Sequence, residues 1–242
     1  MQNYLYMDLY TLEEKHWWHI SKRKIVRYLI EKYVQKKNPH ILDVGCGTGK
    51  NIEELKKYGQ IWGIDNSMEA IEFCKKRGLD NVKHGDAEKT RLPANSFDII
   101  TLLDVLEHTD DNKTLREMKR VLKKRGFLIV IVPAIPWLWS KWDEILHHKK
   151  RYTAKGLKEI FKSYDFSVIY LSYCYSFLVL PALFIRSIKS FISRKNYSSD
   201  FKLSNFFLNI ILGHLARSEF WLAQRLPLPI GTSIIAIVKN EK

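Results

Sequence analysis

Three glycines at alternate positions, Gly45, Gly47 and Gly49, follow a short apolar run that contains one acid, Asp43. Glycine tolerates positive φ and lets backbone N–H groups approach a ligand that a Cβ would keep at a distance. An apolar strand, a glycine turn and a helix N-terminus in succession are typical of a nucleotide-binding site. We therefore expect this stretch to hold a ligand with a nucleoside part.

The spacing of the glycines separates this turn from two common phosphate-binding turns. The dinucleotide fingerprint needs G-x-G-x-x-G, but Lys50 stands at the position of its third glycine, and the Walker lysine pattern is absent as well. Asp43 would repel a pyrophosphate, whereas it suits a cationic ligand. The turn is therefore expected to face a positively charged ligand rather than a pyrophosphate.

Strands and helices must alternate along the chain to position this turn. Several of the strand-like runs are apolar throughout, as in a parallel sheet that helices cover on both faces. Apolar residues before the turn follow a helical period. We predict strands at 41–44, 60–65, 82–85, 97–103, 126–132, 166–171 and 234–239, and helices at 21–35, 51–58, 67–77, 112–122 and 153–163.

Four ordered motifs between residues 38 and 133 resemble those of class I S-adenosylmethionine-dependent methyltransferases. They are Asp43-Val-Gly-Cys-Gly-Thr-Gly49, Gly63-Ile-Asp65, Gly85-Asp86-Ala-Glu88, and Ser96-Phe-Asp-Ile-Ile100 followed by Asp104-Val-Leu-Glu-His108. The resemblance implies a Rossmann-like α/β fold, in which helices cover both faces of a seven-stranded, mostly parallel sheet. It also implies an antiparallel last strand, for which 234–239 is the candidate, and a helical insertion before that strand at 176–229.

The same resemblance implies S-adenosylmethionine as the cofactor and assigns roles to the acids. Asp65 is expected to accept both ribose hydroxyls, because a carboxylate offers two acceptor oxygens. Asp86 is expected to accept from the adenine amine, and Asp43 to hold the methionine ammonium, directly or through water. The expected cofactor-binding residues are Asp43, Gly45, Cys46, Gly47, Gly49, Asp65, Asn66, Asp86, Ala87, Leu103 and Asp104.

A narrower resemblance covers both flanks of these motifs. Glu13-x-x-His16-Trp-Trp18 with Arg23, and Pro133-Ala-x-x-Trp137-Leu-Trp-Ser140-x-x-Asp143 with His148-x-x-Arg151-Tyr-Thr153, look like a bacterial and archaeal methyltransferase group often considered alongside glycosyltransferases and cell-surface polymer synthesis. Trp142 and Lys150 depart from that pattern, which has histidine and arginine there. The resemblance implies that the flanks bind the acceptor through His16, Trp17, His19, Trp137, Trp139, Arg151 and Tyr152.

Methyl transfer from a sulfonium mostly needs positioning, and a hydroxyl acceptor is helped by a general base. His108 and His148 are the expected catalytic residues, and His108 is expected to lie nearest to the methyl group. The alternative for His108 is a helix-cap histidine that only shapes the pocket. The tryptophans are expected to stack on a sugar or prenyl face, although one of Trp137 and Trp139 is alternatively a core residue.

The composition favours anionic partners. The chain has 40 basic and 26 acidic residues and a net charge of +14, which suits nucleic acid, an anionic membrane or simply a solvated lysine-rich surface. Cys46, Cys74 and Cys174 form no C-x-x-C pair, so we expect a reducing compartment and no metal site. Residues 1–12 show no sign of a signal peptide, which favours a cytoplasmic protein.

The predicted insertion combines apolar and basic residues. Its apolar runs, 177–185 and 206–212, are shorter than the roughly 20 residues that span a bilayer, and the first is followed by Arg186, Lys189, Arg194 and Lys195. This arrangement suits peripheral contact with an anionic membrane and a lipid-linked acceptor. The alternative is a lid or a dimer interface.

These observations predict a single methyltransferase domain over 1–242, with a helical lid at 1–37, a cofactor-binding half at 38–133, an acceptor-side segment at 134–175, the insertion at 176–229 and the final strand at 230–242. The expected acceptor is small or lipid-linked, with transfer preferably to an oxygen of a sugar, a polyprenyl-linked glycan or a quinone-like molecule. One alternative is a nucleic-acid methyltransferase, against which the lack of an Asn-Pro-Pro-aromatic sequence argues. The other is a non-catalytic cofactor-binding protein, against which the intact Asp43, Asp65 and Asp86 argue.

Overall fold

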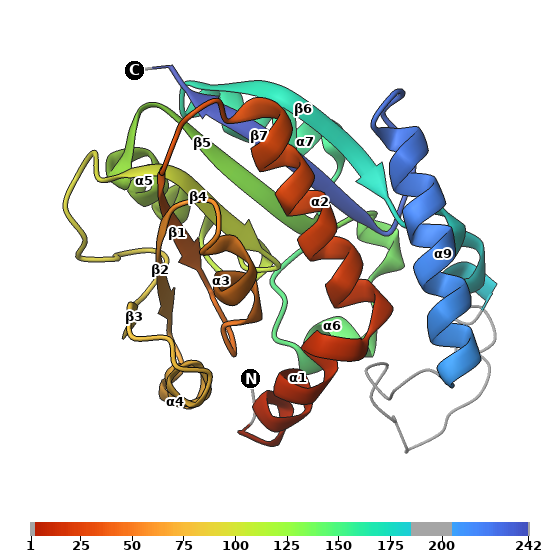
Figure 1. Ribbon diagram of the computed structural model, residues 1–242. Coiled ribbons are helices and arrows are strands. Elements are labelled where there is room, and N and C mark those ends of the chain that lie inside the picture. The colour runs from red at the N-terminus through yellow and green to blue at the C-terminus, as the bar shows by residue number, and fades with distance from the viewer. Residues whose placement is uncertain (1–2, 185–204, 242) are drawn as a thin grey trace.

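The computed structural model describes residues 3–184 and 205–241, which contain a seven-stranded sheet between two layers of helices (Figure 1). The strands are β1 (His40–Val44), β2 (Gln60–Asp65), β3 (Val82–His84), β4 (Phe97–Leu103), β5 (Leu122–Pro133), β6 (Phe166–Cys174) and β7 (Ser233–Asn240). Their order across the sheet is β3-β2-β1-β4-β5-β7-β6. Strands β1 to β5 are parallel, and β7 is antiparallel to both β5 and β6. The predicted Rossmann-like fold with an antiparallel last strand is therefore confirmed.

Alternate residues of the central strands pack into two separate cores. In β5, Leu128 and Val130 face one core, while Ile129 and Ile131 face the other. The helices are α1 (Asn3–Lys15), α2 (Trp17–Tyr33), α3 (Lys50–Leu55), α4 (Met68–Lys76), α5 (Asp111–Val121), α6 (Lys141–Ile145), α7 (Ala154–Ser163) and α9 (Phe206–Ala223), with single 3-10 turns at η1 (Leu106–His108), η2 (Pro136–Leu138) and η3 (Ser176–Leu178). Helices α2, α3, α4 and α9 contribute to the core on one face, and α5 and α7 to the core on the other.

The element boundaries differ from the predictions where polar residues interrupt an apolar pattern. Strand β5 begins at Leu122 rather than at the predicted Gly126. Residues 123–125 are basic, so the apolar pattern used for the prediction does not extend to the start of the strand. Helix α2 begins at Trp17 rather than Ser21, and the imidazole of His16 accepts a hydrogen bond from the Trp18 N–H as its N-cap. Ser67 and Thr153, the first residues of two predicted helices, are the N-caps of α4 and α7, since Ser67 accepts from the Ala70 N–H and Thr153 from the Gly156 N–H.

The region between β6 and β7 is helical where it is described. Residues 179–184 and α9 are helical, which agrees with the predicted helical insertion. The predicted basic residues Arg186, Lys189, Arg194 and Lys195 lie outside the described residues. Among the helices that are described, none combines the length and the apolar character that a membrane crossing needs.

Candidate active site

A cavity of about 640 Å³ lies at the carboxyl ends of β1, β2 and β4, the edge at which open α/β sheets bind ligands. Its volume falls within the range of roughly 300–1,000 Å³ that is usual for small-molecule sites. Side chains of α1 and α2, the glycine turn, the loops after β3 and β4, and the segment around His148 line it. The cavity therefore joins the predicted cofactor half to the predicted acceptor side.

The glycine turn forms one wall, and its shape requires glycine at Gly45. The φ of Gly45 is +70°, and a Cβ added there would lie 2.3 Å from Cγ2 of Val105. The N–H groups of Gly45 and Cys46 both donate to the Ile64 carbonyl, at 2.8 and 3.0 Å, and so fix the turn against β2. Because Gly45 and Gly47 have no side chains, the turn presents backbone atoms to the cavity, as a ligand-binding turn needs.

Asp65 ends β2 beside this turn, with its carboxylate held by two backbone groups. One oxygen accepts from the Gly47 N–H at 2.9 Å and the other from the Ser67 N–H at 3.0 Å. Burial raises the pKa of this carboxyl, and the two N–H bonds oppose that effect. Each oxygen can accept a second hydrogen bond, so the group fits a pair of ribose hydroxyls.

Asp43 lies deeper, with only 2% of the residue exposed. The side chains that hydrogen-bond to it are neutral, namely the Thr101 hydroxyl, which donates to it, and the Asn51 amide, and the charge that acts on it is the negative charge of Asp65. Burial raises the pKa of Asp43 to about 6. A buried carboxylate that lines a cavity without a cationic neighbour suits a cationic group of a ligand, as the sequence predicts.

All but one of the predicted cofactor-binding residues line the cavity. Besides those already described, the lining includes Cys46, Asn66, Asp86, Ala87, Leu103 and Asp104. Gly49 is the exception, because it is the N-cap of α3 and a Cβ added there would meet Leu79 and Cys74 in the core. Its φ of +89° and the nearness of these two side chains explain the glycine without a ligand.

Three of the predicted acceptor residues line the cavity from the start of α2, namely His16, Trp17 and His19. Burial lowers the pKa of both histidines, so their imidazoles are neutral near pH 7. The Trp17 ring also packs against Tyr175 and Phe177, with ring centroids 5.6 and 5.9 Å away. This tryptophan therefore joins the cavity wall to the segment after β6.

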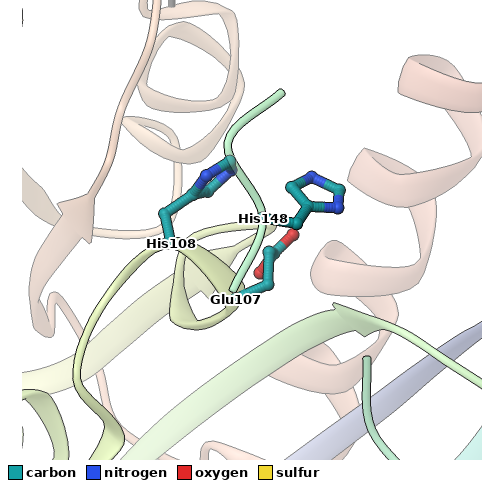
Figure 2. Close-up of side chains that lie close together, drawn as sticks. All are labelled: Glu107, His108 and His148. Carbon is teal, nitrogen blue, oxygen red and sulfur yellow. The ribbon is translucent and has the colours of Figure 1, made fainter. Parts of the chain in front are cut away.

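The two predicted catalytic histidines lie together in the same wall (Figure 2). Their ring centroids are 4.8 Å apart, with His108 at the end of η1 and His148 in the loop after α6. Burial, with a smaller contribution from His148, lowers the pKa of His108 to about 4. His108 is therefore a neutral imidazole near pH 7 that can accept a proton or bind a cation.

Asp143 holds one side of this wall in place. Its fully buried carboxylate accepts from Nε of Arg151 at 2.7 Å, from Nη2 of Arg151 at 3.1 Å and from Nδ1 of His148 at 2.9 Å. Burial alone would raise the pKa of Asp143, but these hydrogen bonds lower it overall. Arg151 lines the cavity as predicted, although part of its hydrogen-bonding capacity is used within the wall.

Three predicted acceptor residues lie outside the cavity lining. Tyr152 is only 4% exposed, and its hydroxyl donates to the Asp111 carboxylate at 2.7 Å within the core. Trp137 and Trp139 are exposed, and the alternative that one of them is a core residue is wrong as well. The structure places Trp142 in the lining instead, on helix α6 beyond the capping box of Ser140 and Asp143.

Two lining residues, Lys22 and Glu107, carry charged groups that the sequence analysis does not assign. Lys22 of α2 donates to the Asp104 carboxylate, and its Nζ lies 3.7 Å from the centre of the Trp18 ring. Glu107 is almost fully buried beside His108. Lys22 stands in a basic stretch that resembles an ordinary solvated helix face, so the sequence gives no signal that it lines the cavity. Glu107 belongs to the quoted Asp104-Val-Leu-Glu-His108 motif, which is a signal that it lies near the site.

Comparison with known proteins agrees with this geometry. Residues 42–130 match the family model described as a methyltransferase domain. The uncharacterized methyltransferase YcgJ of Bacillus subtilis (strain 168) is 37% identical over 122 residues, which are 46% of this chain and 47% of YcgJ. The ubiquinone biosynthesis O-methyltransferase of Coxiella burnetii (strain Dugway 5J108-111) is 33% identical over 124 residues, which are 46% of this chain and 53% of the relative.

The chain thus spans about half the length of the curated relatives that it matches. A crystal structure of a SAM-dependent methyltransferase from Archaeoglobus fulgidus has a TM-score of 0.58 and 19% identity, and the similarity covers 90% of this chain and 94% of that one. This likeness extends the shared fold well beyond the residues of the sequence match.

Proposed function

We propose that this chain, which carries a class I S-adenosylmethionine-dependent methyltransferase domain, transfers a methyl group to an oxygen atom of a small or lipid-linked acceptor. The observation that carries the proposal is one cavity that both the glycine turn and the histidine pair line. A donor and an acceptor bound in that cavity would be held close enough to react.

The cofactor S-adenosylmethionine supplies an electrophilic methyl group on a positively charged sulfonium when it is bound. Asp65 would accept the ribose hydroxyls, and Asp43 would face the ammonium of the methionine portion. Asp86 and the Ala87 backbone would contact the adenine, at the end of the cavity formed after β3. These residues fit the cofactor because two of the carboxylates are buried, fixed by hydrogen bonds and open to the cavity.

Transfer to oxygen is supported by the acceptor side of the cavity. His16, His19 and His108 have lowered pKa values there, and a neutral imidazole can take the proton of a hydroxyl acceptor. The relative from Coxiella burnetii is itself named an O-methyltransferase. The roles of His108 and His148 toward the acceptor, and of Trp17 and Arg151 in binding it, belong to this proposal.

A lipid-linked acceptor is supported by the apolar surface of α9. This helix packs beside α2 (Figure 1), and the Asn209 side chain accepts from the Trp17 N–H at 2.9 Å and donates to the Lys15 carbonyl at 2.9 Å. Its exposed apolar residues include Phe206, Phe207, Leu208, Ile210, Ile211, Leu215, Trp221 and Leu222. These exposed apolar residues, on the same helix as the exposed Arg217 and close to the exposed Lys24 of α2, suit an anionic membrane surface.

The reaction is tested by incubating the protein with methyl-labelled S-adenosylmethionine and a cell extract, which is then separated into lipid, polysaccharide, nucleic-acid and protein fractions. The expected result is label in the lipid or saccharide fraction, and no label with Asp65→Ala. Label in the nucleic-acid fraction would establish the nucleic-acid alternative instead. Tight binding of S-adenosylmethionine without label in any fraction would favour the non-catalytic alternative.

The membrane contact is tested separately by flotation with anionic phosphatidylglycerol vesicles and with neutral vesicles. The protein is expected to float with the anionic vesicles at moderate salt, and Phe206→Ser with Phe207→Ser is expected to reduce the floating fraction. Both phenylalanines are 71% exposed, so the double variant should fold normally. No binding to anionic vesicles by the unchanged protein would remove the argument for a lipid-linked acceptor.

A further inference from the structure

Three side chains in the cavity wall form a cluster with the composition of a metal site. Glu107, His108 and His148 each offer a ligand atom, and these three atoms lie within 4.8 Å of one another. Figure 2 shows the three side chains lying together, two of them from η1 and the third from the loop after α6. All three residues line the cavity.

One oxygen of the buried Glu107 carboxyl group lacks a hydrogen-bond partner. The residue is 1% exposed, and its Oε2 atom has no hydrogen-bond partner within the described part of the chain. A buried carboxylate without a partner is costly, and a bound cation would remove that cost.

His148 is oriented in the way that metal-binding histidines usually are. Its Nδ1 is bonded to the buried Asp143 carboxylate at 2.9 Å, which leaves Nε2 as the atom available to a ligand. Arg151 fixes Asp143 in turn. The backbone adds two restraints, because the Lys149 N–H donates to the Glu107 carbonyl at 2.7 Å and the His148 N–H donates to the Asp143 carbonyl at 2.8 Å.

We propose that Glu107, His108 and His148 bind one divalent transition-metal ion, such as Zn²⁺ or Fe²⁺, at the acceptor side of the cavity. Two imidazoles and one carboxylate are a usual ligand set for these ions, whereas Mg²⁺ and Ca²⁺ prefer oxygen ligands. Ligand atoms about 2.0–2.2 Å from a tetrahedral ion are about 3.4 Å apart, so the side chains would draw together on binding. Three protein ligands leave a coordination position open to the cavity.

The surrounding charges permit a cation at this place. The two positive side chains nearest to it in the cavity lining, Lys22 and Arg151, are each paired with an aspartate, Asp104 and Asp143. These pairs reduce the repulsion that an additional positive ion would meet. Glu107, whose Oε2 atom has no hydrogen-bond partner among the described residues, then offers an oxygen ligand to the ion.

Such an ion would define the class of acceptor, and this part of the inference rests on the proposed function. An acceptor hydroxyl that binds in the open coordination position would have a lowered pKa and would lose its proton more readily, to solvent water, before its oxygen attacks the methyl group. The two histidines would then act as metal ligands rather than as proton acceptors. The acceptor would accordingly be a molecule whose reacting oxygen can bind a metal ion.

The site is tested with the full chain after treatment with a chelator. Titration with Co²⁺ is expected to give one tightly bound equivalent with visible ligand-field absorption, and Zn²⁺ is expected to displace it and to raise the melting temperature. Glu107→Gln and His148→Asn should each weaken binding at least 100-fold. His147→Asn is the matched control, because His147 is an exposed neighbour with φ +59°, which asparagine tolerates.

The Glu107→Gln variant separates loss of the site from loss of folding. It should raise the melting temperature of the metal-free protein, since it removes a buried carboxylate without a partner, and should abolish the rise that Zn²⁺ produces. Absence of a bound equivalent in the unchanged protein, or undiminished Co²⁺ affinity in both variants, would overturn the proposal. Calorimetry with S-adenosylmethionine on the metal-free protein shows independently whether the proposed function stands.

Discussion

Asp43 is expected to make the binding of S-adenosylmethionine depend on pH. Its pKa in the free protein is about 6 because of burial, and a bound ammonium should return that pKa toward the ordinary 3.8. The difference between these two values corresponds to about 3 kcal/mol of binding free energy. Affinity should therefore fall as the pH drops through 6, by about tenfold per pH unit, and level off near pH 4 at about 100-fold.

The Asp43→Asn variant separates this effect from that of Asp65, whose pKa is also raised. It should bind S-adenosylmethionine about 100-fold more weakly at pH 7.5 and lose most of the decline between pH 7 and pH 5. A raised pKa in the folded state means that ionised Asp43 destabilises the fold at pH values above the unfolded-state pKa. The variant should therefore be more stable at pH 7.5, by up to about 3 kcal/mol, since an amide oxygen can still accept from Thr101.

Isothermal titration calorimetry between pH 5 and pH 8, with thermal unfolding in the same buffers, measures both effects. Asp98→Asn is the control, because Asp98 lies at the other end of the sheet and pairs with Lys36 and Lys123, which lower its pKa despite its burial. A lowered pKa contributes stability above the unfolded-state pKa, so this variant should be less stable at pH 7.5 with unchanged affinity. If Asp43→Asn bound the cofactor as tightly as the unchanged protein, with the same pH dependence, the assignment of Asp43 to the ammonium would be refuted.

Three further substitutions test other parts of the cavity wall. Gly45→Ala must place a Cβ 2.3 Å from a Val105 methyl group at positive φ, so it should cost about 2 kcal/mol or more of stability in thermal unfolding and abolish cofactor binding in calorimetry. Tyr152→Phe removes the donor to buried Asp111, so it should cost about 1–3 kcal/mol of unfolding free energy with KM for the acceptor unchanged; a raised KM would restore the predicted role in acceptor binding. Trp137→Ala removes a ring that is 62% exposed, so the free energy of unfolding should change by less than about 0.5 kcal/mol. KM for the acceptor should stay constant, and a raised KM would contradict the position of Trp137 outside the cavity lining.

The cofactor half of the molecule could be predicted from the sequence because its signals are local. The apolar run and the glycines lie within a few residues of one another, and Asp65, Asp86 and Asp104 each stand at or just after the end of a strand. Strands β2 and β4 begin and end at the predicted residues. The fold then brings the carboxyl ends of these strands to one edge, so residues predicted one by one line the same cavity.

The acceptor side could be predicted only in part, because its geometry depends on contacts between distant segments. The sequence offers three tryptophans within six residues, and the sequence alone does not tell which of them reaches the cavity. Trp142 lines it, on the short helix α6 that begins at the capping box of Ser140 and Asp143. Glu107 and His148 are 41 residues apart, and the fold brings them together through the parallel pairing of β4 with β5 and the loop after α6. The hydrophobic periodicity and the motif spacing of the sequence do not indicate that these two residues are in proximity.

Because β7 is antiparallel to β5 and β6, it begins where both of those strands end. Cys174 at the end of β6 and Pro133 at the end of β5 both pair with Ser233, the first residue of β7. The chain therefore leaves the sheet after β6 and returns at β7 on the same edge, next to the cavity. A change in the length of the connection between β6 and β7 would therefore leave the register of β1 and β2, the strands that carry Asp43 and Asp65, unaltered.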